Sequence, residues 1–251
     1  MTQSSGPPHA EETGAVPRAT SRDAPAVTRR LLACGVAATP VFAVVATAQI
    51  PIRDGFDLRR HVVSMLSNGD LGWVQIANFA VSGLLFLAGA VGIRRAMGPN
   101  HGLSQGFGRG GTWGPRLIGV FAVGLLAAAV FVADPMNGFP PGPPVQPTWH
   151  SAVHFTVASL AYIALMGACF VVARGFAARH QPGWAGYSAV TGVVFLAATV
   201  AQVTRANQGL VNVVFFVASV LAFGWVSALA GWLRTQLTGT LLSSSRLRGA
   251  L

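Results

Sequence analysis

Charged side chains are scarce in this 251-residue sequence, and lysine is missing altogether. Asp, Glu and Arg together supply only 10% of the chain, against about a quarter in ordinary soluble domains, while apolar residues supply 52%. This balance excludes an ordinary soluble protein and predicts an integral membrane protein.

The basic residues are all arginine, and no basic run is interleaved with aromatic residues. The formal net charge of +10 would suggest nucleic-acid binding in a soluble protein. No sequence signature of a nucleic-acid-binding module is present, so we expect no nucleic-acid partner. In a membrane protein, arginines instead mark the loops on the cytoplasmic side.

Only two cysteines are present, Cys34 and Cys169, and both lie in apolar segments. Such a thiol is usually a small core hydrophobe, and two of them identify no redox compartment. Cys34 lies too early to follow an apolar signal run, which excludes a lipoprotein. A twin-arginine signal at Arg29-Arg30 and cleavage after Ala48 stay open beside the simpler prediction of an uncleaved first span.

Six apolar segments approach or exceed the length that crosses about 30 Å of hydrocarbon. They predict an all-α fold, a polytopic bundle of six transmembrane helices in a domain over residues 29–235. Residues 1–28 are too polar to repay the entropy of ordering, so we expect a disordered cytoplasmic tail there, and a second cytoplasmic tail over 236–251. The predicted spans are Leu31–Ile50, Gly72–Ile93, Leu117–Ala133, Trp149–Ala173, Ala185–Thr204 and Leu210–Leu233.

The arginines predict the orientation of these spans. Alternate loops lie on opposite faces, and most of the seventeen arginines fall on the face that carries both termini. This face is predicted to be cytoplasmic, in the plasma membrane of the cell. The opposite face carries Asp54, Asp57, Asp70 and Asp134. A proline-rich connection, 134–154, also maps to this outer face and is too rich in proline to continue either flanking helix.

The predicted outer face gathers the residues that could carry chemistry. His150 and His154 are spaced i, i+4 at the start of the fourth span, which places both imidazoles on one side of a helix. His61 would supply a third nitrogen. These three ligands would hold Zn²⁺, whose bound water has a pKa near 7, with Asp134 and Ser64 as catalytic residues that handle protons or orient the substrate.

A structural explanation of the same residues stays open. Imidazoles at a membrane interface also hydrogen-bond backbone carbonyls and the ends of neighbouring helices, and Asp134 before a proline is typical of a helix terminus. The fourth span also lacks the glutamate of the zinc-protease motif. A proton-coupled or anion site is the third alternative.

Other polar residues in the spans have weaker functional signals. Gln75, Asn78 and Ser82 lie on one face of the second span, where such residues usually bond a neighbouring helix. Arg205, near the outer end of the fifth span, is a candidate for binding the phosphate of an anionic lipid as substrate, or it extends to the interface without a ligand.

Four short motifs are spread over the predicted spans and loops: His61-x-x-Ser64-x-x-Ser67, Gly72-Trp73, Asp134-Pro135 and His150-x-x-x-His154. In these motifs the sequence resembles the prokaryotic family catalogued as domain of unknown function 998. The resemblance covers about residues 30 to 235 and implies a six-helix integral membrane protein of bacteria or archaea, with no established activity.

A second similarity concerns the kinds of residue rather than their order. Alkaline ceramidases and adiponectin-receptor-like proteins also combine one Ser, one Asp and three His around zinc, but they have seven spans, and here the first histidine precedes the serine. This similarity implies that a metal-dependent hydrolase of a lipid-like amide or ester is one candidate function. The alternative is a non-catalytic membrane protein that binds lipid, a partner subunit or a small solute.

Overall fold

The computed structural model describes residues 23–98, 107–143, 145–205 and 209–248. Within these residues the fold is all-α, and six helices are long and apolar enough to cross a membrane, as predicted. The expected disorder of residues 1–22 concerns a stretch outside the described residues. The helices are α1 (Asp23–Gln49), α2 (Gly72–Ala96), α3 (Arg109–Val130), α4 (Trp149–Ala178), α5 (Pro182–Arg205) and α6 (Val211–Arg248).

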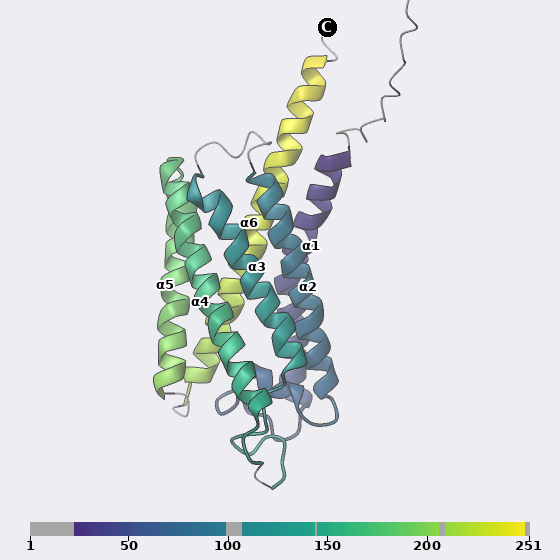
Figure 1. Ribbon diagram of the computed structural model, residues 1–251, viewed down its shortest axis with the longest axis vertical. Helices are drawn as coiled ribbons and strands as arrows, with labels where there is room; N and C mark the ends of the chain where they lie inside the picture. The colour runs from purple at the N-terminus through teal and green to yellow at the C-terminus, as the bar shows by residue number, and fades with distance from the viewer. Residues whose placement is uncertain (1–22, 99–106, 144, 206–208, 249–251) are drawn as a thin grey trace, which may run out of the picture.

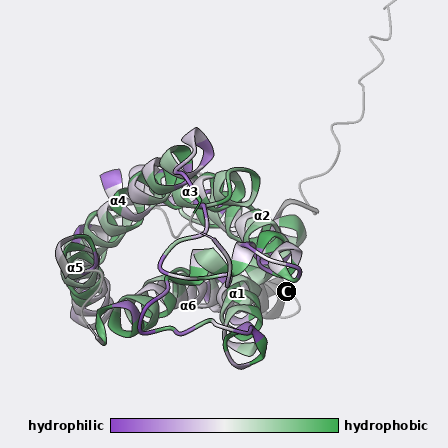
Figure 2. Cartoon of the chain, turned by 90° about the horizontal axis from the view of Figure 1, so that it is seen from below, coloured by the Kyte–Doolittle hydropathy of each residue, from purple (hydrophilic) through white to green (hydrophobic). Residues whose placement is uncertain are grey.

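The six helices form a closed ring. Each helix packs against the next one along the chain, and α6 returns to pack against α1 (Figure 2). The start of α1 and the end of α6 lie at one end of the bundle, while the loops after α1 and α3 lie at the other end (Figure 1). We call this second end the loop end.

Helix α3 begins at Arg109, earlier than the predicted start at residue 117. The segment RGGTWGPR has a low intrinsic helix propensity, which is why it suggested a loop. Its glycines are explained by close packing against α4, because a Cβ on Gly114 would lie 2.6 Å from Cγ2 of Val172, and one on Gly110 would lie 3.0 Å from the carbonyl oxygen of Val171. Tertiary packing therefore overrides propensity here.

The helix ends near the termini also extend past the predicted spans. Helix α1 begins at Asp23, inside the stretch 1–28 for which disorder was predicted. Helix α6 runs for 38 residues, through most of the predicted tail 236–251, to Arg248. Length and hydropathy locate the apolar part of such a helix but not the point where its hydrogen-bonded backbone stops.

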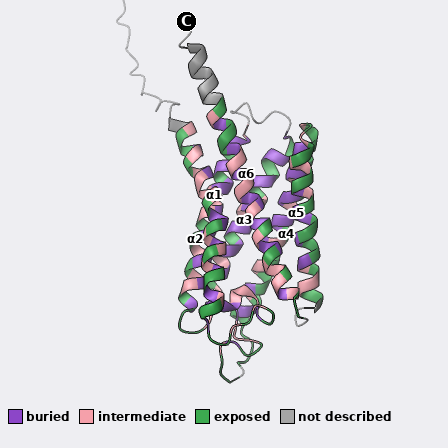
Figure 3. Ribbon diagram, turned by 180° about the vertical axis from the view of Figure 1, so that it is seen from behind, coloured by how far each residue is buried: buried purple, intermediate pink, exposed green. Residues whose placement is uncertain are grey.

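Small residues allow α1 and α2 to approach closely. A Cβ on Gly89 of α2 would lie 2.6 Å from Cα of Gly35 on α1, which is closer than real Cβ atoms come. In a lipid environment, close packing of this kind drives helix association in place of the hydrophobic effect. Buried and exposed residues alternate along the helices (Figure 3).

A buried line of polar side chains joins α1 and α2. Gln49 donates from Nε2 to Oε1 of Gln75 at 2.8 Å, and Nδ2 of Asn78 donates to the carbonyl oxygen of Phe42 at 3.2 Å. Ser82 donates to Oδ1 of Asn78. The prediction that the polar face of the second span bonds a neighbouring helix is confirmed for Gln75 and Asn78.

Candidate functional site

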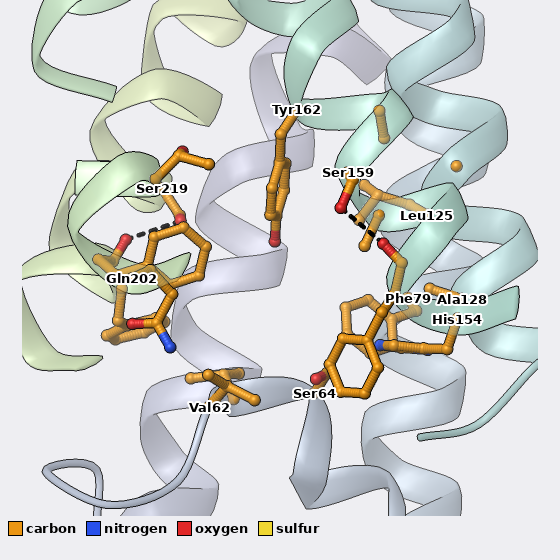
Figure 4. A pocket seen from close by; sticks show the side chains of 18 of the residues that line it. Val62, Ser64, Phe79, Leu125, Ala128, His154, Ser159, Tyr162, Gln202 and Ser219 are labelled. Carbon is orange, nitrogen blue, oxygen red and sulfur yellow. Dashed lines mark hydrogen bonds between the residues drawn. The ribbon is translucent and has the colours of Figure 1, made fainter. Parts of the chain in front are cut away.

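The bundle encloses a cavity of about 330 Å³ near its loop end. Residues from all six helices line it, and so does the short 3₁₀ helix η2 (Val63–Ser67) of the first loop. His154 and Ser159 lie on one wall and Gln202 and Ser219 on the opposite one, with Ser64 beneath (Figure 4). Among the described residues, no Asp, Glu or Arg side chain lines the cavity.

The floor of the cavity is formed by residues 62–64 of the first loop, which folds back under the bundle. Arg53 holds this segment from below. Its guanidinium donates to the carbonyl oxygen of Leu66 at 2.9 Å and to that of Asn68, and it lies over the ring of Phe139 in the proline-rich connection. Burial lowers the pKa of Arg53, and the negative charge of Asp70 opposes this effect.

His61 also fastens the first loop. The backbone N–H of Asp57 donates to Nδ1 of His61 at 2.9 Å, so Nε2 must carry the proton and donate to the carbonyl oxygen of Asn137, 3.1 Å away. The ring is only 2% exposed and packs between Phe56 and Phe139. Both nitrogens of His61 are therefore occupied by the backbone. The segment around it is a turn followed by η2 and not one short helix.

His154 is buried at the cavity wall, 2% exposed. Its Nδ1 lies 2.7 Å from the carbonyl oxygen of Phe131. A carbonyl can only accept, so Nδ1 donates and satisfies a carbonyl left unpaired at the end of α3. The predicted alternative, in which imidazoles bond carbonyls and helix ends, is thus confirmed for His61 and His154.

Asp134 fastens the start of α4. Its carboxylate accepts from the backbone N–H of Thr148 at 2.5 Å and from the Thr148 hydroxyl at 2.8 Å, and Thr148 is the N-cap of the helix. A negative charge at a helix N-terminus also interacts favourably with the helix dipole. Asp134 does act at a helix terminus, as the alternative prediction had it, but at the start of α4 and not at the end of the third span.

The described residues contain no group of three or more His, Cys, Asp or Glu side chains placed to hold a metal ion. His150 is exposed and its ring lies tilted against that of Trp149, with 3.8 Å between the ring centroids, whereas His154 is buried. The nitrogens of His61 and the carboxylate of Asp134 have protein partners. These residues do not fit the predicted zinc site as they are arranged, although Ser64 and His154 do line one cavity.

Two amide oxygens in the cavity lining are buried without a hydrogen-bond partner, Oε1 of Gln202 and Oδ1 of Asn212. Asn212 is 3% exposed, and its Nδ2 donates to the carbonyl oxygen of Arg59 in the first loop at 3.1 Å. Helix α5 ends at Arg205, whose side chain lies outside the described residues, so its predicted role as a lipid-phosphate ligand stays a prediction.

The mouth of the cavity lies between α4 and α5. Three of the lining residues are also exposed at the protein surface: Phe155 and Ser159 on α4, and Val203 on α5, which is 80% exposed. All three lie within helices long enough to span a membrane. The surface-exposed part of the described lining thus lies on α4 and α5, and the first loop closes the cavity at the loop end.

A comparison with family models matches residues 36–232 to the family described as protein of unknown function (DUF998). The chain belongs to this family. The match bears out the resemblance seen in the sequence, and it covers every residue of the cavity lining, from Phe42 to Phe223. The whole described cavity lining of this chain thus lies within the matched region.

No curated protein and no solved structure gave a significant match to this DUF998 chain. The similarity to alkaline ceramidases therefore has no support beyond the residue types that suggested it. Because the family description names no activity, the function must be argued from the cavity.

Sequence reasoning missed the amides of Gln202 and Asn212 at this cavity. Both are polar residues at the ends of apolar spans, which is a signal of function in a membrane protein. Asn212, Phe215, Ser219 and Phe223 also follow one another at three- or four-residue steps along α6, which predicts one shared helix face. The spacing cannot show that this face borders a cavity.

Proposed function

We propose that this protein binds an amphipathic ligand that it takes from the membrane, and that the cavity holds this ligand. The observation that carries the proposal is a cavity inside a ring of helices long and apolar enough to span a membrane, with exposed lining residues on α4 and α5 and a floor closed by the first loop. Its volume of about 330 Å³ falls at the lower end of the range for small-molecule sites, about 300–1,000 Å³.

The lining supports a ligand with a large apolar part. Phe42, Phe79, Phe216 and Phe223 form much of the inner wall, and a few polar groups lie among them. Apolar pockets with a small number of placed polar groups are typical of ligand sites. The partner in this proposal is a membrane lipid. The arginine distribution supports the plasma membrane as the location and the extracytoplasmic side as the side of the cavity.

Filling the cavity tests the proposal. Ala158 lines the cavity, and Ala158→Leu would occupy part of its volume. Ala197→Leu is the matched control, because Ala197 is exposed on α5 and does not line the cavity.

Binding of twelve-carbon amphiphiles (dodecanol, dodecyl methyl ether, dodecanoate and dodecylamine) is measured by native mass spectrometry of protein released from nanodiscs. We expect Ala158→Leu to weaken binding on the order of tenfold and Ala197→Leu to leave it unchanged. If no amphiphile of the series binds, or if filling has no effect, the cavity is not the site.

Hydrolysis of a lipid-like ester or amide is a second candidate, favoured by one observation. Ser64 and His154, both predicted from the sequence as site residues, line the same cavity. A hydroxyl and an imidazole facing one acyl ligand are the usual elements of acyl transfer. Turnover of p-nitrophenyl laurate by purified protein, and its loss in Ser64→Ala, would support this function. Absence of turnover in the unchanged protein would end it.

A further inference from the structure

The cavity holds two hydrogen-bond acceptors that have no donor. Oδ1 of Asn212 and Oε1 of Gln202 are both buried and unpartnered, although the Asn212 amide is fixed in place by its other end, which donates to the first loop. A buried acceptor without a donor costs free energy, so polar atoms of this kind are usually satisfied by water or by a ligand. Both belong to residues that line the same space.

Three of the hydroxyls on the walls cannot supply the missing donors. Ser159 donates to the carbonyl oxygen of Phe155, Thr199 to that of Phe195, and Ser219 to that of Phe215, at 2.7 to 2.8 Å. Each hydroxyl has a single hydrogen, which is used within its own helix. Toward the cavity these three side chains can therefore only accept hydrogen bonds. Ser64 and Tyr162 also line the cavity, and their hydroxyls can donate as well as accept.

The described lining carries no charged side chain, which further restricts the kinds of ligand head group that the cavity can accept. A carboxylate or phosphate would meet no positively charged partner among the described lining residues, so neutral donors alone would have to replace its hydration. An ammonium would enter a low-dielectric space without a carboxylate to pair with it. A hydroxyl group carries a donor and no charge, and this is the group that the lining can accept.

We infer that the ligand is a neutral lipid alcohol. Its hydroxyl donates to the amide oxygens of Asn212 and Gln202, and its apolar chain lies along the phenylalanine walls and leaves through the mouth between α4 and α5. This inference rests on the proposed function and adds the class of ligand.

The head group can be tested with ligands that differ in nothing else. We expect dodecanol to bind more tightly than dodecyl methyl ether, which keeps the oxygen but has no donor, on the order of tenfold, because about one hydrogen bond is lost. Dodecanoate and dodecylamine should bind more weakly than dodecanol. Butanol, a water-soluble alcohol, should bind far more weakly than dodecanol if the source is the membrane.

A variant then identifies the acceptor. Gln202→Met keeps the shape of the side chain and removes its amide, so it should reduce the preference for dodecanol over the ether several-fold. Gln181→Met is the matched control, because Gln181 also has a buried unpartnered Oε1 but precedes α5 at the opposite end. Asn212→Leu should reduce the same preference, and its melting temperature shows whether loss of the bond to Arg59 has destabilised the fold.

The outcomes separate the two proposals. If no member of the series binds, both proposals fail. If the series binds in an Ala158-dependent way but alcohol and ether bind equally, or dodecanoate or dodecylamine binds best, the lipid-alcohol inference is wrong and the amphiphile site stands. If the preference persists in both Gln202→Met and folded Asn212→Leu, the assigned acceptors are wrong. If butanol binds as tightly as dodecanol, the membrane source is wrong.

Discussion

His61 shows how far a single residue type can be interpreted from sequence. An imidazole in a polar loop suggested a metal ligand, but His61 does not line the cavity; the loop that it fastens forms the cavity floor. Its partners were beyond sequence reasoning, because they are backbone atoms of Asp57 and Asn137, and every residue has such atoms. Side-chain type indicates which bonds are available but not which are made.

Replacing His61 should destabilise the protein. His61→Phe keeps an aromatic ring between Phe56 and Phe139 but leaves the N–H of Asp57 and the carbonyl of Asn137 unpaired. We expect a loss of about 1–3 kcal/mol in the free energy of unfolding, measured as a lower melting temperature in detergent. His150→Phe is the control, because His150 is exposed, and it should melt like the unchanged protein. Equal melting temperatures for both variants would contradict the fastening role of His61.

At the scale of the helices, the sequence located all six spans but misplaced several ends. Hydropathy reports the part of a helix that lies in hydrocarbon, so the apolar stretches were found. The predicted third span began at residue 117 and not at Arg109, because glycine indicates a loop when its packing neighbours are unknown. The two amides of the cavity were missed for a related reason. The sequence shows that Gln202 and Asn212 are polar, but it does not show that they line a cavity.

The contact between α1 and α2 predicts a specific sensitivity to added volume. Gly89→Ala would place a methyl group 2.6 Å from Cα of Gly35, so the two helices must move apart. We expect a loss of about 1–3 kcal/mol, typical of overpacking, visible as a lower melting temperature. Gly119→Ala is the matched control, since a Cβ there meets nothing within 4 Å, and alanine favours a helix. A Gly89→Ala protein as stable as Gly119→Ala would show that the helices do not need this approach.

At the scale of the whole molecule, composition alone identified the class. A chain with few charges and six apolar segments must satisfy its backbone hydrogen bonds inside helices when it crosses a bilayer. The ring order of the helices and the cavity inside it could not be predicted, because hydropathy contains no information on which helix faces which.

The orientation across the membrane stays a prediction that labelling can test. With Cys34 and Cys169 replaced by serine, Gly142→Cys places one thiol in the proline-rich connection, and Thr235→Cys places one near the opposite end of α6. A membrane-impermeant maleimide should label the first variant in intact cells and the second only after permeabilisation, because the arginine-rich side is expected inside. The reverse pattern would place the cavity on the cytoplasmic side.

The length of α6 has a consequence for any such measurement. At 1.5 Å per residue its 38 residues extend for about 57 Å, nearly twice the thickness of the hydrocarbon, while its first turn touches the cavity. A fluorescent protein fused after Arg248 would therefore stand clear of the lipid headgroups on a rigid stem. It could report the sidedness of the bundle without crowding the entrance through which we expect the ligand to pass.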